Sequence, residues 1–164
     1  MKVLGITGWS GSGKTTLVTR LLPDLTARGL AISTIKHAHH DFDVDTPGKD
    51  SYEHRAAGAT EVMVSSARRW ALMHEIRNRP EPTLDDLINH MSPVDLVLIE
   101  GFKREGHEKI EVRRGDIERP PLYPDDDQVI AIASDKPLAD AGRPVLALDD
   151  TRAIADFIVG HCGL

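Results

Sequence analysis

Residues 8–15 read Gly8-Trp9-Ser10-Gly11-Ser12-Gly13-Lys14-Thr15 and match the pattern G-x-x-x-x-G-K-[ST] at every fixed position. The motif follows an apolar run and precedes apolar residues at helical spacing, so it predicts a loop between a strand and a helix. Glycines let such a loop wrap around a phosphate chain, and the helix dipole points its positive end at the same place. We therefore expect residues 8–16 to bind nucleotide phosphates. Lys14 would reach the β/γ-phosphates, Thr15 would coordinate Mg²⁺, and Thr16 would donate to the α-phosphate.

Strand and helix patterns alternate on both sides of this loop. Short apolar runs predict buried strands, and apolar residues three and four apart predict helices. The expected strands cover residues 2–7, 30–35, 94–99, 128–133 and 144–148, and the expected helices cover residues 17–25, 51–57, 84–91 and 151–159. Such alternation predicts a mostly parallel sheet with helices on its faces.

Three segments depart from this alternation. Pro23 lies inside the first helical pattern and is expected to kink or break that helix. Residues 61–66 and 70–76 predict an antiparallel hairpin, and residues 109–113 are expected to form an edge strand. The predicted fold class is therefore α/β, a P-loop NTPase-type sheet flanked by helices with an inserted hairpin, in one domain spanning residues 1–164.

Length and charge limit the classes of function. The chain has 164 residues and a formal net charge of −6, which disfavours coating of nucleic acid or of an anionic membrane. Cys162 is the only cysteine, so it cannot form an internal disulfide. The longest apolar stretches are far too short to cross a bilayer. We expect a cytoplasmic protein with neither nucleic acid nor a membrane among its partners.

A phosphate loop usually works with an acid at the end of a core strand that holds the magnesium shell. Asp95 and Glu100 flank the most strongly apolar strand pattern. Ligands of open α/β sheets bind at the carboxyl ends of the strands, so Glu100 is the preferred acid, with a catalytic role beside Lys14. Asp95 is expected to cap or solvate the opposite end of the strand.

The segment after the second predicted strand is rich in histidine and aspartate. Its candidate ligands are His37, His39, His40, Asp41, Asp43 and Asp45. Three interpretations stay open: a nucleotide-responsive loop, a solvated acidic loop, and a Zn²⁺ or Ni²⁺ site. In the first of these, Asp45 and Asp50 are the acids that would bind magnesium or position water.

Recognition of the base is a separate question, because the guanine signature Asn-Lys-x-Asp is absent. Asp135 follows a predicted core strand, and its carboxylate would accept hydrogen bonds from both N1–H and N2–H₂ of guanine. Adenine offers no such pair of donors, so Asp135 would discriminate between the bases. An ordinary turn acid before Pro137 is the alternative.

Several segments together resemble the MobB family of molybdopterin-guanine dinucleotide biosynthesis adaptor proteins. The phosphate loop by itself is shared with many unrelated proteins. The Lys-His-x-His-His and Pro-Gly-Lys-Asp-Ser sequences are much more specific, and the resemblance extends from residue 1 to about residue 136. It is carried by residues 8–16, 35–41, 45–51, 57–59 and 98–103.

The resemblance implies a P-loop GTP-binding protein, usually a homodimer, with weak Mg²⁺-dependent GTPase activity. Such a protein assists the molybdenum cofactor guanylyltransferase, the nucleotidyltransferase that joins GMP to molybdopterin; whether molybdopterin itself contacts this chain is left open. The implied site comprises Lys14, Thr15, the loop acids Asp45 and Asp50, and Glu100. Asp135 as the guanine reader comes from the residue chemistry above and not from the resemblance.

Two other functions remain as alternatives. A small-molecule kinase would transfer the γ-phosphoryl group to a bound acceptor at about 1–100 s⁻¹. A metallochaperone GTPase would use the histidine loop and lose its metal when His39 and His40 are replaced. We expect slow hydrolysis because the sequence shows neither a strong base nor an arginine finger in cis, although Arg104 or Arg55 could act across a dimer.

The turn at Arg68 and Arg69 would serve dimerisation or docking of a partner, or would be an ordinary edge hairpin.

Overall fold

The computed structural model describes residues 1–38 and 42–164. The chain divides into two compact units, of which the first comprises Met1–His37 with Met91–Leu164 and the second comprises Ala38–His90. Each unit is defined by its own internal contacts. The single-domain organisation expected from the sequence therefore stays a prediction.

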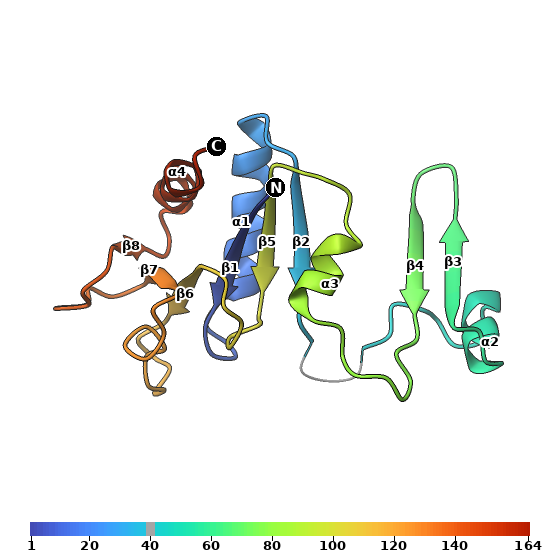
Figure 1. The fold of residues 1–164 in the computed structure, drawn as a ribbon. Coiled ribbons are helices and arrows are strands. Elements are labelled where there is room, and N and C mark those ends of the chain that lie inside the picture. Colours follow the sequence, from blue (N-terminus) through green and yellow to red (C-terminus); the bar gives the residue numbers. More distant parts are fainter. Residues whose placement is uncertain (39–41) are drawn as a thin grey trace. The chain divides into compact units, whose positions relative to one another are not determined.

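The first unit is built on a six-stranded sheet in which every pair of neighbouring strands is parallel. The strand order is β2-β5-β1-β6-β7-β8, and Figure 1 shows β2, β5, β1 and β6 lying side by side. Parallel strands buried on both faces need nearly continuous apolar runs, which is the pattern of β1 and β5. The strands are β1 (Lys2–Thr7), β2 (Ile32–Lys36), β5 (Leu96–Glu100), β6 (Lys109–Arg113), β7 (Val129–Ser134) and β8 (Val145–Ala147).

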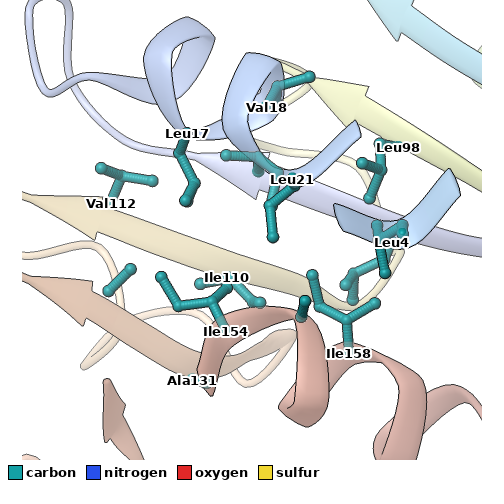
Figure 2. Close-up of a cluster of buried hydrophobic side chains, with 14 of the residues drawn as sticks. Leu4, Leu17, Val18, Leu21, Leu98, Ile110, Val112, Ala131, Ile154 and Ile158 are labelled. Atoms are coloured by element: carbon teal, nitrogen blue, oxygen red, sulfur yellow. The ribbon is translucent and has the colours of Figure 1, made fainter. Parts of the chain in front are cut away.

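Two helices pack against one face of this sheet and enclose the main core. They are α1 (Lys14–Ala27) and α4 (Thr151–Cys162), which also contact each other. Figure 2 shows leucine and valine side chains of α1 and isoleucines of α4 meeting side chains of the strands β1, β5 and β6. No helix among residues 1–38 and 42–164 is long and apolar enough to cross a membrane.

The first helix continues through Pro23, so a break there is wrong, and the kink, the other outcome expected, stays a prediction. Proline removes one backbone donor from the helical ladder. Leu21 and Leu25, on either side of it, are completely buried in the core. Their packing holds the helix on the sheet across the missing hydrogen bond.

The expectation of an edge strand at residues 109–113 is also wrong, because β6 lies between β1 and β7. The charged side chains of Lys109 and Glu111 are buried rather than solvated. Lys109 is 1% exposed and its Nζ donates to Asp126 Oδ2 at 3.0 Å and to the carbonyl of Glu105 at 2.7 Å. Glu111 is fully buried and accepts hydrogen bonds from Leu122 and Tyr123 backbone N–H groups. Loops that bring polar partners therefore cover this part of the sheet.

The second unit contains the predicted hairpin. β3 (Glu61–Ser65) and β4 (Trp70–His74) pair antiparallel in register, and α2 (Asp50–Ala56) contacts β3. α3 (Leu84–Asn89) begins with a capping box, in which Thr83 and Asp86 exchange side-chain and backbone hydrogen bonds.

Candidate nucleotide-binding site

The turn between β1 and α1 has the backbone of a loop that can enclose an anion. Gly8, Gly11 and Gly13 have φ values of 142°, 81° and 96°, conformations that residues with a Cβ rarely adopt. A Cβ on Gly8 would lie 2.5 Å from the carbonyl oxygen of Val112, so this position also needs glycine for space. The loop leads directly into α1 at Lys14, which places the first N–H groups of the helix at the mouth of the loop.

Thr15 and Glu100 meet beside this loop. The Thr15 hydroxyl donates to Glu100 Oε1 at 2.6 Å, and Lys36 Nζ lies 3.7 Å from the same oxygen. The register explains the meeting, because Glu100 pairs with Ile6 of β1 on one side and with Lys36 of β2 on the other. The parallel strands β1, β2 and β5 thus end at the same edge of the sheet, and the glycine-rich loop lies at that edge.

The oxygen atoms of Thr15 and Glu100 fit a magnesium ion. Mg²⁺ takes oxygen ligands and usually binds to proteins through one or two groups while it keeps waters and substrate phosphates. A hydroxyl and a carboxylate 2.6 Å apart at the start of α1 supply such a pair. Asp95, the other acid considered, accepts the backbone N–H of Ala31 at 2.8 Å at the opposite end of β5, as expected for a capping role.

Lys14 curls over the loop that precedes it. Its Nζ donates to the carbonyls of Gly8 at 3.1 Å and Trp9 at 2.9 Å. Burial lowers the pKa of Lys14, and the positive charge of Lys103 lowers it further, while Glu100 acts in the opposite direction. A phosphate at this position would reduce the repulsion among these cations.

Asp135 lies at the same edge of the sheet, directly after β7. Its Oδ1 accepts the backbone N–H of Gly115 at 2.8 Å, which ties the segment after β6 to the segment after β7. This contact gives Asp135 a structural role. Its second oxygen has no hydrogen bond among the described residues, and recognition of guanine stays a prediction.

The loop acids belong to the second unit, where they surround an arginine. Asp45 accepts from the Ser51 hydroxyl at 2.8 Å and from Arg55 Nε at 3.3 Å. Arg55 also pairs with Asp43 and with Glu75, and its hydrogen bond holds the pKa of Asp43 below the ordinary value. These contacts make Asp45 part of a partly buried network inside the second unit.

The metal roles of Asp45 and Asp50 stay predictions, as does a role of Arg55 or Arg104 across a dimer. Asp50 begins α2, and Arg104 is exposed in the segment after β5. Arg55 is held by three carboxylates, so acting on a phosphate would require it to leave them.

The histidine loop is described only in part, because His39, His40 and Asp41 lie outside the described residues. His37 donates its backbone N–H to the carbonyl of Glu100 at 2.9 Å, and its ring lies 4.5 Å from that of Phe102. Within residues 1–38 and 42–164, no three metal-binding side chains gather around one point. The metal interpretation is neither supported nor contradicted by these contacts.

Sequence reasoning missed three cations that surround Trp9 and the loop. Lys103 Nζ lies 4.4 Å and the Arg119 guanidinium 5.6 Å from the centre of the Trp9 ring. Arg114 Nε donates to the carbonyl of Ser12 at 3.2 Å. Arg114 follows a strand that ends at the loop, and this placement was the signal available in the sequence.

The chain has the features that define the class of P-loop folds. These are a parallel α/β sheet, a glycine-rich turn from β1 into a helix, and an acid at a strand end that accepts a hydrogen bond from the first hydroxyl of that helix. A family model described as molybdopterin guanine dinucleotide synthesis protein B (MobB) matches residues 3–135. The adapter protein of molybdopterin-guanine dinucleotide biosynthesis in Escherichia coli K12 is 48% identical over 160 residues, covering 96% of this chain and 91% of that protein. Its Haemophilus influenzae counterpart is 44% identical, covering 95% and 86%.

A solved structure agrees with these relatives. The crystal structure of a molybdopterin-guanine biosynthesis protein B has a TM-score of 0.78 at 28% identity, covering 99% of both chains. The chain belongs to the MobB family, which confirms the resemblance, the fold class and a role in molybdopterin guanine dinucleotide biosynthesis.

Proposed function

We propose that this protein is a GTP-binding adaptor with weak Mg²⁺-dependent GTPase activity, assisting the guanylyltransferase that joins GMP to molybdopterin. The observation that carries the nucleotide part is the Thr15–Glu100 contact of 2.6 Å at the mouth of the glycine-rich loop. In this proposal Lys14 and the loop amides hold the phosphates, and Thr15 and Glu100 hold the Mg²⁺ shell.

Slow hydrolysis follows from how Glu100 is engaged. Its carboxylate accepts from Thr15 and faces Lys36, so it is arranged to hold a metal shell rather than to take a proton from water. Phosphoryl transfer depends mainly on positioned charge, and a partner that adds charge at the γ-phosphate would speed it. Weak activity by itself therefore suits an adaptor.

Calorimetric titration with GTP and with ATP, each with Mg²⁺, tests the nucleotide part. We expect GTP to bind at least about tenfold more tightly than ATP, because guanine offers paired donors that a carboxylate can read. In Glu100→Gln, the effect of Mg²⁺ on GTP affinity should shrink, whereas Asp95→Asn, at the other end of β5, should keep it. Equal or tighter binding of ATP would favour the small-molecule kinase instead.

The homodimer implied by the resemblance has its own structural support in the hairpin of the second unit. Met63 and Trp70 are 62% and 64% exposed, and Val64 and Leu72 are also exposed, so β3 and β4 present apolar side chains to solvent. We propose that this hairpin contacts a second copy of the chain. Sedimentation of the parent should give a dimer and that of Met63→Ser/Trp70→Ser a monomer. A parent that sediments as a monomer would refute the homodimer.

A further inference from the structure

We propose that Arg114 is a positioning residue for nucleotide phosphates, which holds one peptide group of the glycine-rich loop from the side of β6. The inference rests on the proposed function, because it concerns the loop that we propose for GTP. Arg114 directly follows β6, and its Nε donates to the carbonyl of Ser12 at 3.2 Å. A Cβ on Gly13 would lie 3.3 Å from a terminal nitrogen of the same guanidinium group. The guanidinium therefore lies against the peptide that joins Ser12 to Gly13.

This contact decides which way the next amide points. A trans peptide is planar and directs its C=O and the following N–H to opposite sides. Because the Ser12 carbonyl faces Arg114, the N–H of Gly13 points away from Arg114. In the described part of the chain no acceptor takes this N–H, and it immediately precedes the first N–H groups of α1. Free N–H groups at the start of a helix are donors to phosphate, so Arg114 keeps one such donor available.

The side chain of Arg114 is engaged by the loop alone. Among the residues that the structure describes, it forms no ion pair, and its one side-chain hydrogen bond goes to Ser12. The neighbouring Arg113, by contrast, is paired with the buried Glu111 at 3.3 Å. Arg114 therefore serves the loop, whereas Arg113 serves the segment after β6.

Asp135 holds Arg114 from both sides. Arg113 at the end of β6 pairs with Ser134 at the end of β7, so the residues that follow these strands lie side by side. The backbone N–H of Asp135 donates to the carbonyl of Arg113 at 3.4 Å, and Asp135 Oδ1 accepts the N–H of Gly115 at 2.8 Å. These two partners flank Arg114 in the chain. The backbone that carries the guanidinium group is thus fixed to the end of β7.

Asp135 is also the residue expected to read guanine, so its carboxyl group has two separable roles. Its Oδ1 holds Gly115, and through Arg114 this contact affects any ligand that has phosphates. Recognition of guanine would affect only ligands that carry this base. A polyphosphate without a base therefore isolates the positioning role.

Calorimetric titration with inorganic tripolyphosphate and Mg²⁺ tests the proposal. We expect about tenfold weaker binding by Arg114→Met, which lacks the donor, and by Asp135→Ala. Loss of the negative charge of Asp135 would by itself strengthen binding of an anion, so weaker binding has the sign of lost positioning. Asp135→Asn keeps an oxygen for Gly115 and should restore most of the affinity that Asp135→Ala loses. Arg152→Gln, exposed on α4, is the matched control and should bind as the parent does.

A double variant and a spectrum without ligand test the chain of contacts itself. Arg114→Met/Asp135→Ala should bind no more weakly than the weaker single variant, because both substitutions break one chain of contacts. In nuclear magnetic resonance spectra of protein with isotope-labelled glycine, the Gly13 amide signal should move in both single variants. It should stay in place in Arg152→Gln.

Two titration results would overturn the proposal: parent-like binding of tripolyphosphate by Arg114→Met, or tighter binding by Asp135→Ala. Losses that multiply to about 100-fold in the double variant would also overturn it, because they would show independent contributions. A parent that binds no tripolyphosphate would refute the phosphate role of the loop together with the proposal. Failure of guanine recognition would show instead as equal affinities for GTP and ATP in a parent that still binds tripolyphosphate. Gly115 is exposed, so water can replace Asp135 at its N–H, and circular dichroism checks that the variants are folded.

Discussion

Lys14→Ala should weaken binding of Mg·GTP by about 100-fold or more, the scale expected when a partly buried charge is removed from an ion pair. Lys14 Nζ already reaches the carbonyls of Gly8 and Trp9, so a phosphate held by the loop would meet the ammonium group directly. Calorimetric titration of the parent and the variant measures the change.

Lys2→Ala is the matched control, because Lys2 begins β1 at the end of the strand opposite the loop. It should bind GTP as the parent does. Unchanged affinity in Lys14→Ala, in a protein that is still folded by circular dichroism, would refute the phosphate role of the loop. Equal losses in both lysine variants would show that general charge, rather than position, attracts the nucleotide.

The central part of the fold was predictable because it depends on short-range patterns. The strand at β1 matches the expected residues 2–7, and the meeting of Thr15 with Glu100 follows from a rule about strand ends. The helix break at Pro23 was wrong because propensity alone ignores the burial of Leu21 and Leu25.

The position of β6 was not predictable in the same way. A charged residue at every second position is typical of a strand with one face in water. Lys109 and Glu111 instead find partners in segments 11 to 17 residues later. Such pairs depend on the path of long loops, which no local pattern encodes.

The candidate site, too, was predictable from the sequence only in part. The glycine-rich loop and Glu100 were identified from the sequence, whereas Arg114 and Arg119 were not. Arg119 reaches Trp9 because the segment after β6 folds back, and the hydrogen bond from Trp9 to Pro120 joins positions 111 residues apart. The partners of Asp45 likewise include Arg55, ten residues away in α2.

Glu111 holds the segment after β6 that folds back to Trp9. Its two carboxylate oxygens accept the backbone N–H groups of Leu122, at 3.1 Å, and Tyr123, at 2.9 Å, and one of them accepts from Arg113 at 3.3 Å. Glu111→Ala would leave the half-buried Arg113 without its counter-ion and two N–H groups without acceptors. We expect the free energy of unfolding to fall by about 3–5 kcal/mol, as when one member of a buried ion pair is removed.

Urea denaturation followed by far-UV circular dichroism measures this loss, with Glu108→Ala as the control. Glu108 pairs with His161 at the surface, and exposed pairs of this kind add little to stability. Equal losses in the two variants would show that Glu111 does not anchor the segment. If it does, Glu111→Gln should also change the fluorescence emission of Trp9 before the protein unfolds, because Pro120 moves with the segment. This emission is measured in the Trp70→Phe protein, in which Trp9 is the only tryptophan. Buried charge in β6 would then act on the phosphate loop through Trp9.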